Sequence, residues 1–537
     1  MNKQTFPIVI ACLLALFGVQ YAVNKIYPPI PRPPRPVPAA PAITTNVVET
    51  IQAAPALVPA PVTTSATRPA EQIVTLSNDC VRVEITSWGG AVKSVDLLKY
   101  HTVLSGPALT LPGDDIFTIE QSDARTVVLR GTGVTKTLTL GDDYRLTGKF
   151  VVPAGLTNLL ITVGTAAPAD AKEAPNYLNV DWQGGPKFSN RDVNKVMKRT
   201  RTGENREFIH AQWVGVKSQF FATILSLPTN AVSVTYTPVG LPAWQSQPKS
   251  PATNGVTAVV EVPVTRAADG SATCTFTLYA GPKDFDRLQA LGQSQEEAMD
   301  FGSWMDGYSG IFGWLLLRSL NFFHALIPSY AIAIILVTIA LKIVFWPIQA
   351  KSIASMKAMQ KFQPHVKKLK DKYKDDPQRL NQETMKLYKE HKINPFSGCL
   401  PMLVQMPVLI AFYKVLGGNC ALRGESFLWI KDLAQPDTIY TLPFALPLLG
   451  ILAINPLPLL MAGSMIWQQK ITPQTGDPQQ AKMMMFMPLI MVFMFYNMAA
   501  GLTLYWTLQQ FLSILQQWLS LRKESRTAPV LTTGKSK

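Results

Sequence analysis

The sequence predicts a polytopic α-helical membrane protein that also carries a large β-sandwich domain outside the cytoplasm. Long charge-free stretches lie beyond residue 330, several of them reaching the ~20 apolar residues that span a bilayer as a helix. Residues 71–290 alternate instead between apolar and polar positions, as half-buried strands do. The chain has 537 residues, 47% of them hydrophobic, and a net charge of +15. This composition suits a membrane protein with basic cytoplasmic segments better than a nucleic-acid binder.

The N-terminal segment is apolar from Phe6 to Val23 and follows a short start that contains Lys3. No small-residue cleavage pattern closes this run, so residues 1–27 are predicted to be a retained transmembrane anchor and not a cleaved signal. Residues 28–70 hold twelve prolines and few charges. This composition is typical of an extended linker.

The β-domain is predicted from short alternating runs that turn signals separate. Val81–Ile85, Val232–Tyr236 and Cys274–Leu278 alternate, and glycine pairs such as Gly89-Gly90 lie between such runs. A β-sandwich over residues 71–290 is the expected result. It contains no recognisable catalytic motif or phosphate loop, so a scaffolding role or contact with a partner is expected.

The five cysteines leave two interpretations open. Cys80 and Cys274 flank the β-domain and form a disulfide if it is exported, or else both remain thiols. The chain contains no CxxC pair and no Cys/His cluster, so neither a metal nor another cofactor is expected.

The C-terminal half is predicted to be helical and largely membrane-embedded. Its segments, in order, are an interfacial amphipathic helix at 311–327, a transmembrane helix at 328–350, a cytoplasmic helical hairpin at 351–392, transmembrane helices at 393–413, 454–470, 483–499 and 500–521, and a basic cytoplasmic tail at 522–537. An apolar stretch, Thr438–Ala453, leads into the third of these spans.

Orientation follows from charge. Residues 351–392 carry twelve Lys/Arg against five Asp/Glu, which places this loop in the cytoplasm by the positive-inside rule. Counting spans outward places both termini in the cytoplasm and the β-domain outside. The loop also reads as two antiparallel helices, with Asp376 as N-cap and Pro377 at the first helical position. Its lysines form either a simple solvated face or a contact for an acidic partner or lipid head groups.

Lys342 is the one charge within Tyr330–Ala350. An ionised residue at the centre of a span costs at least ~2.5 kcal/mol on insertion scales, so it marks a functional site by default. Lys351, the next charge, is about 13 Å further along a helix, which is beyond the reach of one lysine side chain. Snorkelling to the surface and a polar cavity in the membrane are therefore both open, and the second is favoured.

Several motifs of the helical half resemble those of the YidC/Oxa1/Alb3 membrane-protein insertases, of the Gram-negative bacterial type. The resemblance covers about residues 311–522 and is carried by Asn394–Pro407, Phe427–Leu433, Gln468–Pro473, Met485–Pro488 and Gly501–Trp506. The anchor, linker and β-domain are similar to the large periplasmic region of those relatives.

The resemblance implies a function. Members of this family insert and fold newly synthesised inner-membrane proteins, alone or with the Sec translocon, and are not enzymes. It implies a five-helix core around a hydrophilic groove that opens to cytoplasm and lipid. By position, Lys342, Thr338, Gln405, Tyr505 and Trp506 are the implied groove residues. The implied partners are nascent membrane proteins, the Sec translocon, the lipid bilayer, and the ribosome and targeting receptor, which the cytoplasmic hairpin and tail contact.

The sequence departs from the family pattern at three places. Lys342 stands where relatives usually have arginine, which keeps the charge but loses the planar fork. Asn497–Gly501 replaces a more usual aromatic-Pro-Ser-Gly turn, and Thr438–Ala453 has no counterpart in the shorter relatives.

Two other classes are less well supported. Transporters usually show paired repeats or broken helices, and none is evident. An intramembrane protease needs catalytic groups at depth, yet no predicted span holds Asp, Glu or an HExxH motif.

Overall fold

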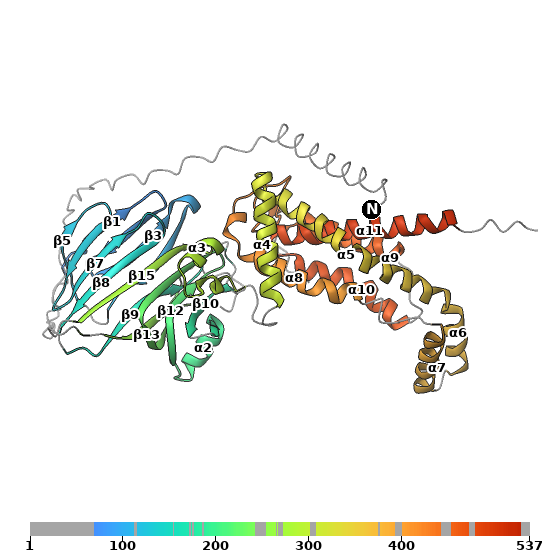
Figure 1. Cartoon of the computed structure of the whole chain (residues 1–537), viewed down its shortest axis with the longest axis horizontal. Helices are drawn as coiled ribbons and strands as arrows, with labels where there is room; N and C mark the ends of the chain where they lie inside the picture. The colour runs from blue at the N-terminus through green and yellow to red at the C-terminus, as the bar shows by residue number, and fades with distance from the viewer. Residues whose placement is uncertain are drawn as a thin grey trace, which may run out of the picture. The chain divides into compact units, whose positions relative to one another are not determined.

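The structure, a computed structural model of the chain, describes residues 69–527 apart from 112–114, 154, 171–172, 174–176, 185–186, 242–253, 265, 267–271, 301–307, 374–375, 392–399, 442–452 and 472–477. The predicted anchor, nearly all of the linker and most of the tail lie outside these residues. The described chain contains a β-domain followed by a helical region (Figure 1).

A small antiparallel sheet opens the β-domain, with the strand order β1-β2-β3-β4. Its strands are β1 Ile73–Ser77, β2 Val81–Thr86, β3 Ala91–Leu97 and β4 Thr102–Ala108. The turn between β2 and β3 is Gly89-Gly90, and both glycines have positive φ (69° and 53°), which a residue with a side chain rarely adopts. The glycine pair therefore marks a turn, as the sequence predicts.

The larger sheet follows the order β11-β10-β12-β13-β15-β8-β7-β6-β5, and β14 joins β13 to β9 beside this path. Its strands are β5 Thr118–Ser122, β6 Thr126–Arg130, β7 Thr135–Leu140, β8 Arg145–Val152, β9 Asn158–Ala166, β10 Asn179–Gly184, β11 Lys187–Asp192, β12 Arg206–Lys217, β13 Phe221–Gly240, β14 Asn254–Pro263 and β15 Ala272–Pro282. The helices α2 (Val193–Arg201) and α3 (Phe285–Ala290) accompany it. The three alternating runs of the sequence lie in β2, β13 and β15, so the predicted β-sandwich is confirmed.

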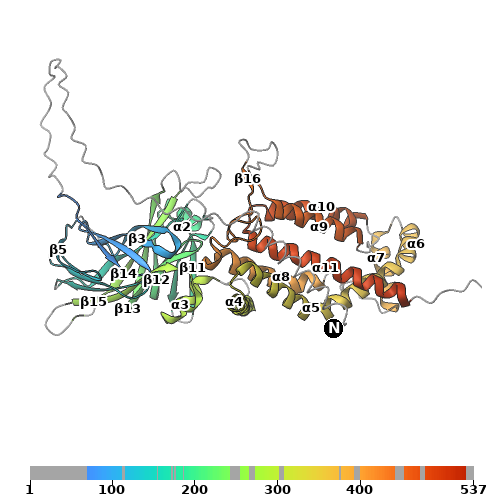
Figure 2. The same ribbon diagram turned by 90° about the horizontal axis from the view of Figure 1, so that it is seen from above.

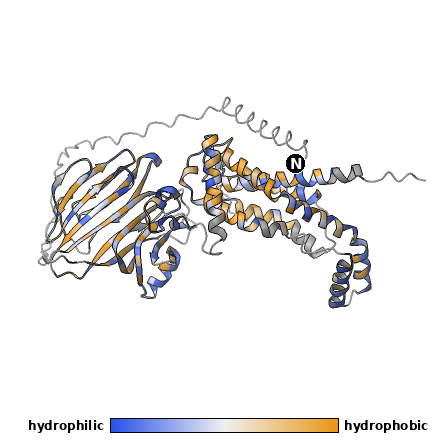
Figure 3. Cartoon of the chain, viewed as in Figure 1, coloured by the Kyte–Doolittle hydropathy of each residue, from blue (hydrophilic) through white to orange (hydrophobic). Residues whose placement is uncertain are grey.

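Alternation along the strands builds the core between the two sheets. In β8, Leu146, Phe150 and Val152 are buried, whereas Arg145, Lys149 and Val151 are exposed. This period of two follows from the pleat, which points successive side chains to opposite faces. Figure 3 shows the same alternation of hydrophobic and hydrophilic residues along the strands.

A buried lysine ties the two sheets together. Lys136 on β7 is fully buried, and its Nζ donates to the carbonyl oxygens of Gly89 at 2.6 Å, Gly90 at 3.0 Å and Leu109 at 2.9 Å. The ammonium also lies over the rings of Phe117 (4.7 Å) and Phe150 (4.9 Å). Because β7 belongs to the large sheet and the Gly89-Gly90 turn to the small one, the side chain is a polar link across an apolar core.

A buried ion pair lies at the other end of the large sheet. Lys217 on β12 is 2.6 Å from Asp181 on β10, and both side chains are almost fully buried. Lys217 also donates to the carbonyl oxygen of Ala298 at 3.1 Å. Burial raises the pKa of Asp181 to about 6, and Lys217 opposes that rise.

The helical region consists of longer elements. Their bounds are α4 Tyr308–Leu326, α5 Tyr330–Lys361, α6 Gln363–Lys372, α7 Pro377–Glu390, α8 Leu400–Gly418, α9 Pro456–Ile471, α10 Pro478–Phe495 and α11 Ala500–Thr527. Figures 1 and 2 show α5, α8, α9, α10 and α11 running alongside one another, and α11 contacts α5, α8 and α9. Within the described residues, α5 alone is long and apolar enough to cross a membrane by length and composition, and Met485–Phe495 is a shorter apolar helix.

Two local features fall on segments that the sequence singled out. Asp376 caps α7 by accepting from the backbone N–H of Arg379, with Pro377 at the first position, and α6 contacts α7. The sequence predicts that the stretch Thr438–Ala453 leads into a transmembrane helix at residues 454–470. Near its two ends, β16 (Tyr440–Thr441) pairs antiparallel with β17 (Ala453–Ile454), and α9 begins at Pro456.

Candidate functional site

Lys342 lies in the middle of α5 and is only 3% exposed. Its Nζ donates to Gln349 Oε1 at 2.5 Å, on the same helix, and to Ser513 Oγ at 2.8 Å, on α11. Both acceptors are neutral, and Lys342 forms no ion pair within the part of the chain that the structure describes. The side chain is therefore held inside the helical region and does not extend to a surface, which argues against snorkelling.

Hydrogen bonds continue from Lys342 along α11 to α8. Ser513 Oγ donates to the carbonyl oxygen of Gln509 at 2.8 Å, and Gln509 Nε2 lies 3.5 Å from Gln405 Oε1. Gln405 in turn donates to the hydroxyl of Tyr505. Three helices thus supply one polar cluster, defined here by Lys342, Gln349, Gln405, Tyr505, Gln509 and Ser513.

Aromatic packing fixes the α8 side of this cluster. The ring of Tyr505 stacks on Phe412 with 3.7 Å between centroids and 12° between planes. Both rings are almost fully buried. Because the stack holds the Tyr505 ring, its hydroxyl is fixed in place to accept from Gln405.

Two of the residues implied by resemblance lie beside the polar cluster and not in it. Thr338 is fully buried, but its hydroxyl donates to the carbonyl oxygen of Ile334, one turn back on α5, at 2.6 Å. Trp506 packs against Phe495 (5.6 Å) and Tyr505 (6.4 Å), and its indole N–H has no hydrogen-bond partner among the described residues. The structure therefore joins Lys342, Gln405 and Tyr505 and leaves the other two as neighbours.

Sequence reasoning missed Gln349, Gln509 and Ser513. The signal was present, since polar residues recur along α11 at Tyr505, Gln509, Ser513, Gln516 and Ser520. Spacings of three and four place these side chains along one face of a helix. These amides and hydroxyls carry no charge, so the high cost of a charge in an apolar helix does not mark them as it marks Lys342.

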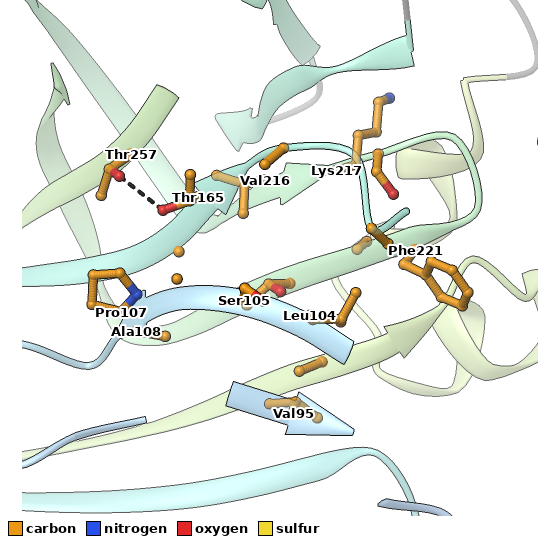
Figure 4. A pocket seen from close by; sticks show the side chains of 18 of the residues that line it. Val95, Leu104, Ser105, Pro107, Ala108, Thr165, Val216, Lys217, Phe221 and Thr257 are labelled. Atoms are coloured by element: carbon orange, nitrogen blue, oxygen red, sulfur yellow. Dashed lines mark hydrogen bonds between the residues drawn. The ribbon is translucent and has the colours of Figure 1, made fainter. Parts of the chain in front are cut away.

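The β-domain contains a separate cavity of about 370 Å³. Figure 4 shows Val95 and Leu104 of the small sheet on one side and Val216 and Phe221 of the large sheet on the other. Its wall is mostly apolar, and Thr165 and Thr257 bond to each other there at 2.8 Å. None of the predicted site residues lines it.

Two family models match different parts of this chain. Residues 322–527 match the family model described as 60Kd inner membrane protein, and residues 123–315 match the YidC periplasmic domain. A protein of Geobacter metallireducens named membrane protein insertase YidC is 30% identical, with 96% of this chain and 98% of the relative covered. The chain belongs to the YidC family. The resemblance inferred from the motifs is thereby confirmed.

Other relatives match mainly one part of the chain. A YidC of Pelobacter propionicus is 42% identical over 57% of this chain, and one of Syntrophus aciditrophicus is 46% identical over 45% of it. These matches span 53% and 42% of the relatives' own length, so the chain matches about half of each. The YidC names denote an insertase and not an enzyme, and the two family descriptions agree with an inner-membrane protein that has a periplasmic domain.

Two solved YidC structures have a low overall similarity to this chain. A structure described as an active YidC insertase with its first transmembrane domain resolved has a TM-score of 0.36 at 16% identity, covering 83% of this chain and 92% of that one. YidC from Thermotoga maritima has a TM-score of 0.28 at 13% identity, covering 82% and 98%.

Proposed function

We propose that this YidC-family chain inserts newly synthesised proteins into the inner membrane and helps them fold there, alone or with the Sec translocon. The observation that carries the proposal is the buried Lys342 ammonium, held by neutral oxygens where α5 and α11 meet. A permanently paired lysine has no charge to offer. Both acceptors of Lys342 are neutral, so its ammonium is available to an acidic group on a client.

The proposed site is a hydrophilic groove, open to cytoplasm and lipid, lined by Lys342, Gln405 and Tyr505 with Thr338 and Trp506 beside them. Amide and hydroxyl groups at this depth support it, since buried polar groups in a membrane need partners or water. Such a groove shortens the low-dielectric path that a hydrophilic flank must cross. Unit charges 4 Å apart attract by ~4 kcal/mol at an effective dielectric of 20, against ~1 kcal/mol in water, so the lysine attracts an acidic flank strongly there.

Departure of the client into lipid completes the proposed cycle. The apolar helix of the client leaves the groove sideways, and its transfer from water contributes ~25 cal/mol for each Å² of apolar surface buried. No nucleotide hydrolysis by this chain is required.

The proposed topology has α5, α8, α9, α10 and α11 as the five spans of the core, preceded by the anchor at residues 1–27. The N- and C-termini and the α6–α7 hairpin lie in the cytoplasm, and the β-domain lies in the periplasm. The basic hairpin and tail are the proposed contacts for the ribosome and the targeting receptor. The positive-inside rule supports this orientation.

The test uses cells depleted of their own insertase and complemented with variants of this chain. The client is a single-span protein with a short acidic flank, and protease access to that flank reports insertion. Lys342→Glu is expected to reduce insertion to the depleted level because it repels the flank, and Lys342→Arg is expected to preserve it because the charge remains.

A second client, with its acidic residues changed to Asn and Gln, is the matched control and is expected to depend much less on residue 342. Normal insertion of the acidic client by Lys342→Glu, at normal protein levels, would refute the electrostatic role. A solute flux through proteoliposomes without any client would favour a transporter instead.

A further inference from the structure

The two ligands of Lys342 are arranged to hold its ammonium without neutralising it. Gln349 follows Lys342 by seven residues on α5, and Pro347 lies between them inside the helix. Residues seven apart share a face of a helix. The 2.5 Å contact between Lys342 Nζ and Gln349 Oε1 shows that the two side chains turn toward each other along this face.

Ser513 fixes the ammonium from the opposite helix. Its Oγ accepts a hydrogen bond from Lys342 at 2.8 Å and donates one to the carbonyl oxygen of Gln509. The hydroxyl is thereby oriented with its lone pairs toward the lysine. The position of the ammonium is therefore determined by two helices. The Ser513 hydroxyl does not rotate freely, because both its proton and its acceptor side are occupied.

The chemistry of these acceptors sets how easily they are exchanged. A hydrogen bond from an ammonium to a neutral oxygen is charge-assisted on the donor side alone. A carboxylate acceptor adds the attraction of an opposite charge. An acidic side chain that reaches Lys342 is thus a better ligand than the Gln349 amide, whereas a carboxylate built into the chain at that place would occupy the lysine permanently.

We infer that Gln349 and Ser513 are positioning residues that hold the Lys342 ammonium between clients, and that a client carboxylate takes the place of the Gln349 amide. This inference rests on the proposed insertase function. It makes the neutrality of residue 349 a determinant of specificity for acidic flanks. The site favours acidic clients because its own ligands to the lysine are weaker than theirs.

Gln349→Glu tests the inference because it replaces the side-chain amide by a carboxylate and keeps the length of the side chain. In the complementation assay with the acidic client, we expect insertion to fall by at least ~tenfold, toward the level of the depleted cells, because the new carboxylate pairs with Lys342. With the neutralised client, insertion is expected to stay within about twofold of the unsubstituted chain, since no carboxylate competes for the lysine.

Gln360→Glu is the matched control, because it adds the same charge to the same helix at an exposed position. It is expected to leave both clients unaffected. If Gln349→Glu does not accumulate in the membrane, Ser513→Asp places a carboxylate at the other ligand position and is expected to show the same preference for the neutralised client.

The outcomes separate this inference from the proposed function. Loss with Lys342→Glu but normal insertion of the acidic client by Gln349→Glu, or by Ser513→Asp in its place, overturns only the exchange of ligands. Equal loss of both clients, or an equal effect of Gln360→Glu, also overturns it, because the defect is then structural or a general effect of charge. Normal insertion by Lys342→Glu overturns the proposed electrostatic role itself.

Discussion

Replacing Lys136 by methionine is expected to weaken the link between the two sheets of the β-domain. The substitution keeps the length of the side chain but leaves the carbonyl oxygens of Gly89, Gly90 and Leu109 without their donor. Each buried carbonyl left unsatisfied costs ~1–3 kcal/mol, and the removal of a desolvated ammonium offsets part of that sum. We expect the free energy of unfolding to fall by about 2–4 kcal/mol at pH 7.

The pH dependence of this difference is more diagnostic than its size. Burial lowers the pKa of Lys136 from 10.5 to about 7. Between these values the unfolded chain binds more protons at this residue than the folded chain, so the contribution of Lys136 to stability rises with pH. The limiting slope is ~1.4 kcal/mol per pH unit, and Lys136→Met lacks it. The difference in the free energy of unfolding between the unsubstituted chain and Lys136→Met should therefore increase from pH 7 to pH 10.

Pulse proteolysis of the full chain in urea, scored by survival of the β-domain fragment, measures both quantities. All other titrating groups are shared by the two proteins and cancel in the difference. Lys149→Met, at an exposed position on the neighbouring strand β8, is the control for loss of a lysine. A gap that stays constant or narrows between pH 7 and pH 10 would refute the assigned protonation behaviour, and a more stable Lys136→Met would refute the link between the sheets.

Three further predictions concern other parts of the molecule. Asp181→Asn should destabilise the β-domain by ~3–5 kcal/mol in the same assay because it leaves the buried Lys217 unpaired, and Asp181→Asn combined with Lys217→Met should recover part of that loss. Since the pKa of Asp181 is raised to about 6, the folded chain binds more protons there between pH 4 and pH 6, and the contribution of this carboxyl should decrease as pH rises through that window. Cys80 and Cys274 are free thiols in the structure, so both should react with a maleimide after denaturation without reductant, and a faster band on a non-reducing gel would show the disulfide instead. Tyr505→Phe keeps the stack on Phe412 and should lower the free energy of unfolding by only ~1 kcal/mol. Tyr505→Ala loses both the stack and the hydrogen bond from Gln405 and should lower it by ~3–5 kcal/mol. Equal losses in the two variants would mean that the hydroxyl contributes most of the stability.

Elements with strong local signals were predictable from the sequence. The alternating runs in β2, β13 and β15 and the cap at Asp376 follow from periodicity and from residue preferences that operate within a few residues. Lys342 was detectable because a charge in an apolar helix is costly whatever surrounds it.

What the sequence could not supply depends on contacts between distant residues. The partners of Lys342 lie 7 and 171 positions away, and no local rule identifies Ser513 as its ligand. Lys136 alternates correctly for an inward position of β7, but only the tertiary structure shows that three carbonyl oxygens meet it there. The pairing of β16 with β17 could not be predicted for a related reason. Each strand has only two residues, which is too short to show an alternating pattern within an apolar stretch.

That short strand pair has a practical consequence. Tyr440 opposes Ile454 and Thr441 opposes Ala453, so the chain leaves and returns at neighbouring points. An insertion between positions 442 and 452 therefore does not change the distance between the two paired strands, and the helices that follow keep their positions. An epitope or a fluorescent reporter grafted there, on the side proposed to be periplasmic, would give a handle for purification or for labelling intact spheroplasts. The polar cluster around Lys342 would remain untouched.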